Sequence, residues 1–236
     1  MGMVPHQSLE LNVSTHPMAV DGNVGGEWRG SLDPLREEII AWLVDLVGVE
    51  VIIQAKEEFF IQTGKVFHDD ENYHRRMSYF LDYFIFVRSL PALSPPHNLT
   101  PFELYRQSHS QLLVQHFTHS LFKVQKIHST GLMIQDLCSN EKLRIQKQSD
   151  ELFDGVTKND VFQGSIFKLE NNLILSHGLI FHPARSHRLL AKMIKESKKQ
   201  GTFIQFDFLA RSARLQLKQS RLRHVDPRLV YADLRV

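Results

Sequence analysis

The spacing of the apolar residues changes from a helical period to a strand period about half-way along this chain. Up to His119 they recur at steps of three and four residues, as Leu35, Ile39 and Trp42 show. From Leu121 to His182 they recur mostly at every second position. Steps of three and four place side chains on one face of a helix, whereas alternate residues share one face of a sheet. The chain is therefore predicted to be α+β, with helices first and strands after them.

Helix start and stop signals divide the N-terminal half into helices. Asp33-Pro34 predicts the first start, because Asp can accept from the first-turn amides and Pro needs no donor there. Gly48 is expected to kink or divide the stretch that follows, which ends near Gly64. A third helix is predicted over Asp70–Arg88, and Thr100-Pro-Phe-Glu103 is a capping box that begins the fourth.

Short strands are predicted after these helices, separated by small polar residues and glycines that tolerate turn conformations. Their expected ranges are Leu121–His128, Gly131–Leu137, Glu141–Gln148, Val161–Leu169 and Leu173–His182. Closing short antiparallel strands into a barrel removes edges that would otherwise pair with other chains. We therefore expect a small five-stranded antiparallel β-barrel, either SH3-like or OB-like.

The last part of the chain is predicted to form a helical hairpin. One helix is expected from Pro183 to Gly201. Residues 202–223 fit both a strand and a helix, and we favour the helix because of its length. The expected organisation is a flexible tail over 1–31, a helical domain over 32–118, a small β-barrel over 119–183, and a basic helical hairpin with a C-terminal tail over 184–236.

Several short stretches between Met77 and Pro183 carry a family resemblance. They are Phe80–Phe86, Leu99–Tyr105, Ser120–Val124, Gly131–Leu137 and Asn159–Gly164. This part of the chain resembles a module of uncharacterised bacterial proteins, some of which also carry a SEC-C metal-binding motif. The resemblance implies helices that lead into a small β-domain, and no established activity comes with it. The SEC-C cysteines are absent from this sequence, so that metal function is not implied.

The chain is polarised in charge, although its formal net charge is only +2. Residues 184–236 hold 13 Lys and Arg against 4 Asp and Glu, a formal +9, whereas residues 1–183 hold 15 against 22, a formal −7. Two rows of cations stand at helical spacing: Arg188, Lys192, Lys195 and Lys199, then Arg211, Arg214, Lys218 and Arg221. Each row predicts a basic stripe that can be solvated, dock an acidic protein, or neutralise phosphates of nucleic acid or lipid.

The densest polar cluster gives a weak candidate for a metal site. Imidazole and carboxylate groups ligate metals, so His68, Asp69 and His74 are candidate ligands, but helix capping is the favoured explanation of the acids. His116 and His119, three residues apart, form a second weak metal candidate. Walker, dinucleotide-binding and nucleophile-elbow motifs are absent from the sequence, so an enzyme is the less expected class and no cofactor is predicted.

Composition bounds the expected location. The single cysteine, Cys138, cannot form an internal disulfide, which suits a reducing compartment. The longest nearly apolar stretch, Ile39–Val49, is shorter than the roughly 20 residues needed to cross a bilayer. Residues 1–31 lack the pattern of a secretory signal. We therefore expect a cytoplasmic protein without a membrane span.

Together these features favour a non-enzymatic binding or adaptor protein. Its basic C-terminal hairpin would dock an acidic protein partner or a second copy of this chain. The alternative is a nucleic-acid-binding protein that uses the same basic surface. A metal-dependent hydrolase at His68, Asp69 and His74 is a weaker alternative.

Overall fold

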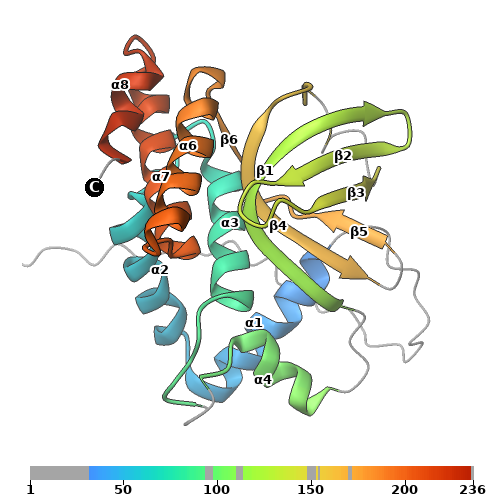
Figure 1. The fold of residues 1–236 in the computed structure, drawn as a ribbon. Coiled ribbons are helices and arrows are strands. Elements are labelled where there is room, and N and C mark those ends of the chain that lie inside the picture. The colour runs from blue at the N-terminus through green and yellow to red at the C-terminus, as the bar shows by residue number, and fades with distance from the viewer. Residues whose placement is uncertain are drawn as a thin grey trace, which may run out of the picture.

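The chain folds into an α+β structure in which helices pack against one side of a curled sheet (Figure 1). The computed structural model describes residues 32–93, 98–109, 114–147, 153, 155–169 and 172–234. Seven α-helices and six strands lie in these ranges. The predicted α+β class and the helical N-terminal half are confirmed, while the expected tail over 1–31 lies outside the described residues.

The N-terminal helices follow local signals closely. They are α1 (Asp33–Val47), α2 (Glu50–Thr63), α3 (Tyr73–Phe86) and α4 (Pro101–Ser108). Gly48 and Gly64 end α1 and α2 with φ of 86° and 89°, values that favour glycine. The capping box of α4 is confirmed, since Glu103 N donates to the Thr100 hydroxyl oxygen at 3.2 Å and Thr100 N donates to the Glu103 carboxylate at 2.8 Å.

Three details of the helix predictions are wrong. Asp33 lies inside α1 and pairs with Arg36 at 2.6 Å instead of capping the helix. The third helix begins at Tyr73, because Asp70 accepts from Phe67 N in the turn before it. The fourth helix ends at Ser108, and Phe117, which the helical spacing includes, lies in the first strand.

An open antiparallel sheet replaces the expected closed barrel. Its strands are β1 (Val114–His128), β2 (Gly131–Asp136), β3 (Lys142–Gln146), β4 (Val161–Leu169), β5 (Asn172–Leu175) and β6 (Ile180–His182). The order is β3-β2-β1-β4-β5, and β6 pairs with the start of β4. Within the described ranges no ladder joins β3 to β5, so the five-stranded barrel prediction, SH3-like or OB-like, is wrong.

The break between β5 and β6 explains the extra strand. Residues 173–182 were expected to form one strand, but the chain leaves the sheet at Ser176 and returns at Ile180. A Cβ at Gly178 would lie 2.5 Å from the backbone nitrogen of Tyr79 in α3. The backbone therefore packs directly on α3 here, which requires glycine and interrupts the pairing with β4.

The C-terminal part, from Ala184 onward, consists of helices joined by short turns. It comprises a 3₁₀ turn η1 (Ala184–Ser186), α6 (His187–Gln200), α7 (Gln205–Arg221), α8 (Pro227–Tyr231) and a 3₁₀ turn η2 (Ala232–Leu234). The ambiguous segment 202–223 thus holds a helix from Gln205 onward. Gly201, at φ 71° and ψ 14°, ends α6 in the left-handed conformation and turns the chain toward α7.

A buried polar network centred on Gln163 of β4 fastens α7 and α3 to the sheet. The Gln163 amide nitrogen donates to the Tyr79 hydroxyl at 2.7 Å and to the Leu209 carbonyl at 3.1 Å. Its amide oxygen accepts from the Ser212 hydroxyl at 2.6 Å and lies 3.0 Å from Nε2 of His182. All four hydrogen-bonding positions of the amide are therefore used, which removes the cost of burying it.

Two neutral histidines complete this network. Because the amide oxygen only accepts, His182 donates from Nε2 and accepts on Nδ1 from the Tyr231 hydroxyl at 2.8 Å. The Tyr79 hydroxyl donates to Nε2 of His119 at 2.9 Å, and Nδ1 donates to Ser165 at 2.8 Å. Burial lowers the pKa of His119 to about 4 and, together with nearby positive groups, that of His182 to about 3.

These shifts predict a loss of stability in mild acid. Below pH about 6.5 the unfolded chain protonates both imidazoles, whereas the folded chain leaves them neutral until about pH 4. Each histidine then lowers the free energy of unfolding by about 1.4 kcal/mol per pH unit over this window. Urea unfolding at pH 7 and pH 5 measures the effect. His182→Gln should have a lower free energy of unfolding than the parent at pH 7, but this free energy should fall less between pH 7 and pH 5. The control is His128→Gln, at an exposed position, which should behave as the parent. An equal fall in the free energy of unfolding in all three proteins would contradict this account.

Candidate functional site

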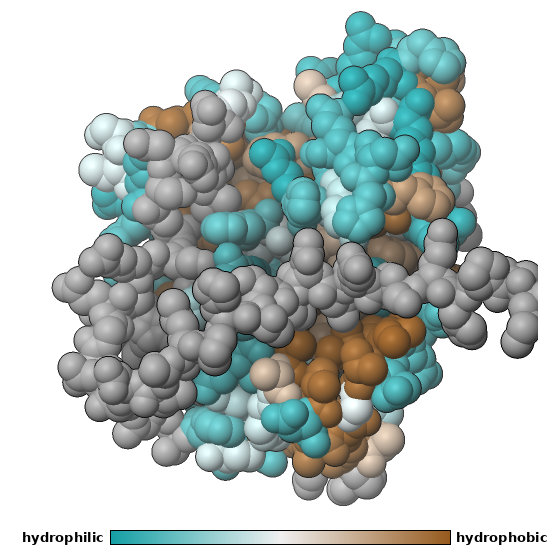
Figure 2. All heavy atoms as spheres, turned by 180° about the vertical axis from the view of Figure 1, so that it is seen from behind, coloured by the Kyte–Doolittle hydropathy of each residue, from teal (hydrophilic) through white to brown (hydrophobic). Residues whose placement is uncertain are grey.

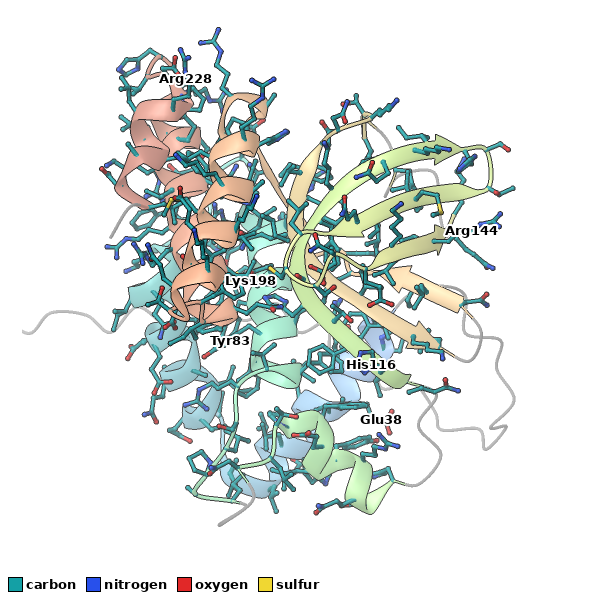
Figure 3. The ribbon with its side chains drawn as sticks, in the orientation of Figure 1. Glu38, Tyr83, His116, Arg144, Lys198 and Arg228 are labelled. Atoms are coloured by element: carbon teal, nitrogen blue, oxygen red, sulfur yellow. The ribbon has the colours of Figure 1, made fainter. Side chains whose placement is uncertain are left out.

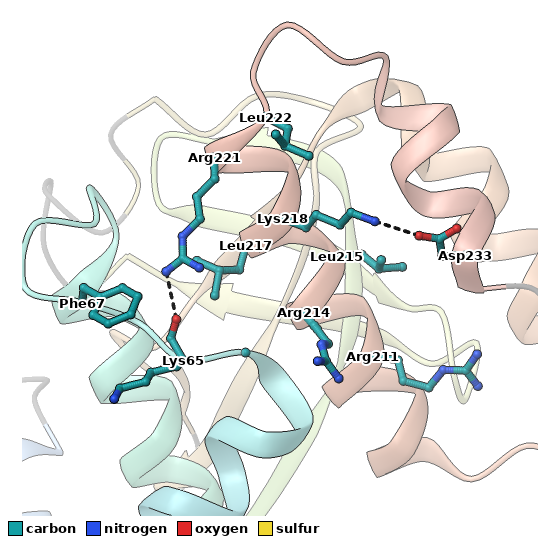
Figure 4. Close-up of a pocket in the computed structure, with 11 residues that line it drawn as sticks. Lys65, Phe67, Arg211, Arg214, Leu215, Leu217, Lys218, Arg221, Leu222 and Asp233 are labelled. Carbon is teal, nitrogen blue, oxygen red and sulfur yellow. Dashed lines mark hydrogen bonds and ion pairs between the residues drawn. The ribbon is translucent and has the colours of Figure 1, made fainter.

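One row of predicted cations lines a groove on the C-terminal side of the molecule (Figure 4). α7 forms its floor, the segment after α2 forms one wall, and η2 contributes to the other. The groove has a volume of about 780 Å³. Its lining residues are Gly64, Lys65, Phe67, Arg211, Arg214, Leu215, Leu217, Lys218, Arg221, Leu222 and Asp233.

The sequence of α7 explains why its cations gather in a narrow strip. Its neighbouring positions are buried against α2, α8 and the sheet, namely Phe208, Leu209, Ala210, Ser212, Ala213, Leu215 and Leu217. The exposed residues that remain fall at steps of three and four and share one face. Arg211, Arg214, Lys218 and Arg221 are therefore aligned along the groove, as the sequence spacing predicted.

Two arginines of this row lack an acidic partner among the described residues. An Arg211 guanidinium nitrogen donates to the Leu234 carbonyl at 3.1 Å, and an Arg214 nitrogen lies 3.5 Å from the Ile61 carbonyl oxygen. Both side chains remain exposed. Because a guanidinium binds a carboxylate or phosphate through two parallel hydrogen bonds, these two groups retain most of their capacity for an external anion.

The other two cations of the row are held by carboxylates. Arg221 binds Asp70 through two hydrogen bonds of 3.1 and 2.7 Å, and it also donates to the Lys65 carbonyl at 2.9 Å. The hydrogen bond from Arg221 lowers the pKa of Asp70 and keeps this carboxyl ionised. Lys218 pairs with Asp233 at 3.0 Å. These pairs position the two walls relative to α7.

Lys65 and Phe67 belong to the groove although sequence reasoning missed them. Phe67 is 50% exposed, which is unusual for a large aromatic residue. The Lys65 ammonium and the Arg221 guanidinium lie 5.6 and 5.3 Å from its ring centroid, within cation–π range. The two residues lie about 150 positions away from α7 in the chain, so no local pattern links them to its basic row.

The predicted row on α6 does not line this groove. Arg188, Lys192, Lys195 and Lys199 are exposed on the side of α6 opposite Leu190 and Ile194, which are buried against the sheet and α7. Lys192 pairs with Glu196 at 3.5 Å, and the other three have no carboxylate partner among the described residues. Seen from behind, the surface over the C-terminal helices is largely hydrophilic (Figure 2).

The metal candidates are arranged for packing. The ring of His68 stacks on Tyr73 with centroids 4.1 Å apart, and His74 meets the same ring edge-on at 5.5 Å. Asp69 is exposed beside them, and within the described part of the chain no group of three His, Cys, Asp or Glu side chains can hold a metal ion. The described residues also include no helix long and apolar enough to cross a bilayer.

Comparison of the chain with family models, curated proteins and solved structures gives no match. The resemblance to a module of bacterial proteins therefore stays a prediction.

Gly64 is expected to be the residue on which the shape of this wall depends. A Cβ there would lie 2.9 Å from Cδ2 of Leu217, and φ is 89°. Gly64→Ala should lower the free energy of unfolding by about 1–3 kcal/mol, measured by urea unfolding. Gly201→Ala is the comparison without a steric contact, since Gly201 also has positive φ (71°) but no atom within 4 Å of the added Cβ, and its ψ of 14° places it in the left-handed region that alanine adopts at lower cost than the ψ of 138° at Gly64. A loss no larger at Gly64 than at Gly201 would show that contact with α7 is unimportant.

Proposed function

We propose that this protein is a non-enzymatic binding or adaptor protein that docks an acidic segment of a partner protein in the α7 groove. The single observation that carries the proposal is the pair of exposed arginines, Arg211 and Arg214, that have no acidic partner among the described residues. The single cysteine favours a reducing compartment, so we place this function in the cytoplasm.

The mixed lining of the groove favours a peptide over a bare polyanion. Leu215, Leu217 and Leu222 contribute apolar surface beside the cations, and Phe67 adds a half-exposed ring. In an extended peptide, alternate side chains point to opposite sides. A segment that alternates acidic and apolar residues would therefore pair its carboxylates with the arginines and bury its apolar groups on the leucines.

A second candidate function is nucleic-acid binding through the same surface. Phe67 is the observation that favours it, because an exposed aromatic ring among cations can stack on an unpaired base. This candidate predicts a preference for single strands over the acidic peptide.

The first test removes the two exposed arginines. A labelled peptide in which Glu and Leu alternate should bind the parent protein, and Arg211→Gln with Arg214→Gln should weaken binding about tenfold or more, measured by fluorescence anisotropy. The matched control is Arg75→Gln with Arg106→Gln, two exposed arginines of α3 and α4 outside the groove lining. If both pairs of substitutions weaken binding equally, net charge alone explains the binding and the groove is rejected as the site. If a single-stranded oligonucleotide binds more tightly than the peptide, the second candidate function is favoured.

A second test raises the charge of the groove. Among the described residues that line the groove, Asp233 is the one carboxylate, and it forms an ion pair with Lys218. Asp233→Asn should tighten peptide binding two- to fivefold at low salt, since an exposed ion pair contributes about 0.2–1 kcal/mol. The control is Glu196→Gln, which also removes one negative charge and frees Lys192 on α6. It should leave the affinity for the peptide nearly unchanged. An equal gain from both substitutions would contradict a local effect.

A further inference from the structure

A second cationic surface lies on the outer face of β1, β2 and β3, away from the α7 groove. The antiparallel register places Lys123, Gln135 and Lys142 side by side across the three strands. The next row on the same face consists of Lys126, Met133 and Arg144; Met133 lies two residues before Gln135 on β2, and Arg144 lies two residues after Lys142 on β3. Neighbours in register share a face of the sheet, so all these side chains point to the same side.

Among the described residues of β1, β2 and β3, none that points to this face is acidic. A bulge between Val124 and Lys126 adds Gln125 to it, and the Gln125 amide donates to Gln135 at 2.8 Å. The residues of the face are Lys123, Gln125, Lys126, His128, Gly131, Met133, Gln135, Lys142, Arg144 and Gln146. An ordinary solvated sheet face mixes charges of both signs, whereas this one carries four cations and no carboxylate.

The cations of this face are available to a ligand. None of Lys123, Lys126, Lys142 and Arg144 pairs with a carboxylate in the described residues, and all but Lys123, which is half-buried, are exposed. On the same side of β1, the preceding residues His119 and Leu121 are buried beneath the helices. The sheet therefore extends beyond its helical cover and leaves this end open (Figure 3, where Arg144 is labelled).

α6 borders the open face. The Lys198 ammonium contacts the Cys138 carbonyl in the turn that joins β2 to β3. Leu190 and Ile194 of α6 pack in one cluster with Leu121 of β1. Lys198 therefore places one further cation at the border of this face, whereas the row of Arg188, Lys192, Lys195 and Lys199 lies on the opposite side of α6.

The spacing of the cations suits a regular polyanion. Strands lie about 4.8 Å apart and alternate residues of one strand about 6.6 Å apart. Lys123 and Lys142, on the two strands that flank β2, are thus separated by about 10 Å at the backbone. A nucleic-acid duplex carries one negative charge per about 1.7 Å of its axis, so several phosphates reach a face of this size at once.

We propose that the outer face of β1–β2–β3 binds the phosphate backbone of a nucleic-acid duplex. Lys and Arg supply the charge, and the glutamine amides can donate to phosphate and sugar oxygens without reading sequence. A single strand would need large aromatic platforms for its bases, and the ten positions of this face include no Phe, Tyr or Trp. An acidic peptide would gain little apolar contact here, since Met133 is the only large apolar side chain on the face.

This site is separate from the α7 groove and goes beyond the proposed function. None of its residues lines that groove. With both sites occupied, the protein would join a duplex to an acidic protein partner, which is a specific form of the adaptor role.

The test uses labelled random-sequence DNA and RNA duplexes and a labelled single strand, with the full chain titrated between about 50 and 200 mM salt. The parent should bind both duplexes with strong salt dependence and prefer them to the single strand. Lys126→Gln with Arg144→Gln should weaken duplex binding about ten- to a hundredfold near 0.1 M salt and reduce the slope of log K against log salt by about two. Circular dichroism and thermal unfolding of this variant should match the parent, because both side chains are exposed.

The groove variant, Arg211→Gln with Arg214→Gln, is the matched control, since it also removes two positive charges. It should keep duplex binding within about twofold while losing the acidic peptide, and the sheet variant should show the reverse. The proposal is overturned if neither duplex binds in a salt-dependent way, if the single strand binds more tightly, or if the groove variant loses duplex binding as much as the sheet variant. Failure of the peptide to bind would reject the groove function and leave the result for the sheet face intact.

Discussion

The amide of Gln163 is the interaction on which the placement of α7 depends. It bonds to Tyr79 of α3, to Leu209 and Ser212 of α7, and to His182 of β6. Removing any one of these partners would leave part of the buried amide without a hydrogen bond and lower the free energy of unfolding by about 1–3 kcal/mol. The network therefore fixes α7 in one orientation on the sheet, and this orientation decides which side of the helix is left for solvent.

A second buried contact sets the other helical layer. Arg36 of α1 contacts Asp82 of α3 and donates to Ser176 after β5 at 2.8 Å. Burial raises the pKa of Asp82 despite the nearby guanidinium. α3 thus lies between two buried polar contacts, one to α1 and one to the sheet and α7. A shift of α3 would leave the buried polar groups of both contacts without their partners, which costs free energy. The helices around the groove wall are therefore held as one unit.

The sequence predicted those features whose cause is local. The glycine ends of α1 and α2 and the capping box at Thr100 depend on residues within one helical turn, and the basic row of α7 depends only on helical spacing. The sixth strand was not predictable in this way, because the strand expected over 173–182 is broken by the approach of Gly178 to α3. Phe67 was missed for the same reason, since its contact with Arg221 joins residues about 150 positions apart.

Charge counted along the chain also misjudges where the positive surfaces lie. Residues 1–183 have a formal charge of −7, yet they include the sheet face on which four cations stand without a carboxylate. The row on α7 belongs to the +9 segment, but Asp70 and Asp233 hold two of its four members. On the sheet face, strand register brings like charges together. On α7, ion pairs across the groove reduce the number of cations that are free to bind an anion. Affinity for an anion therefore follows the pairing of each cation in the folded chain more closely than the net charge of the segment that carries it.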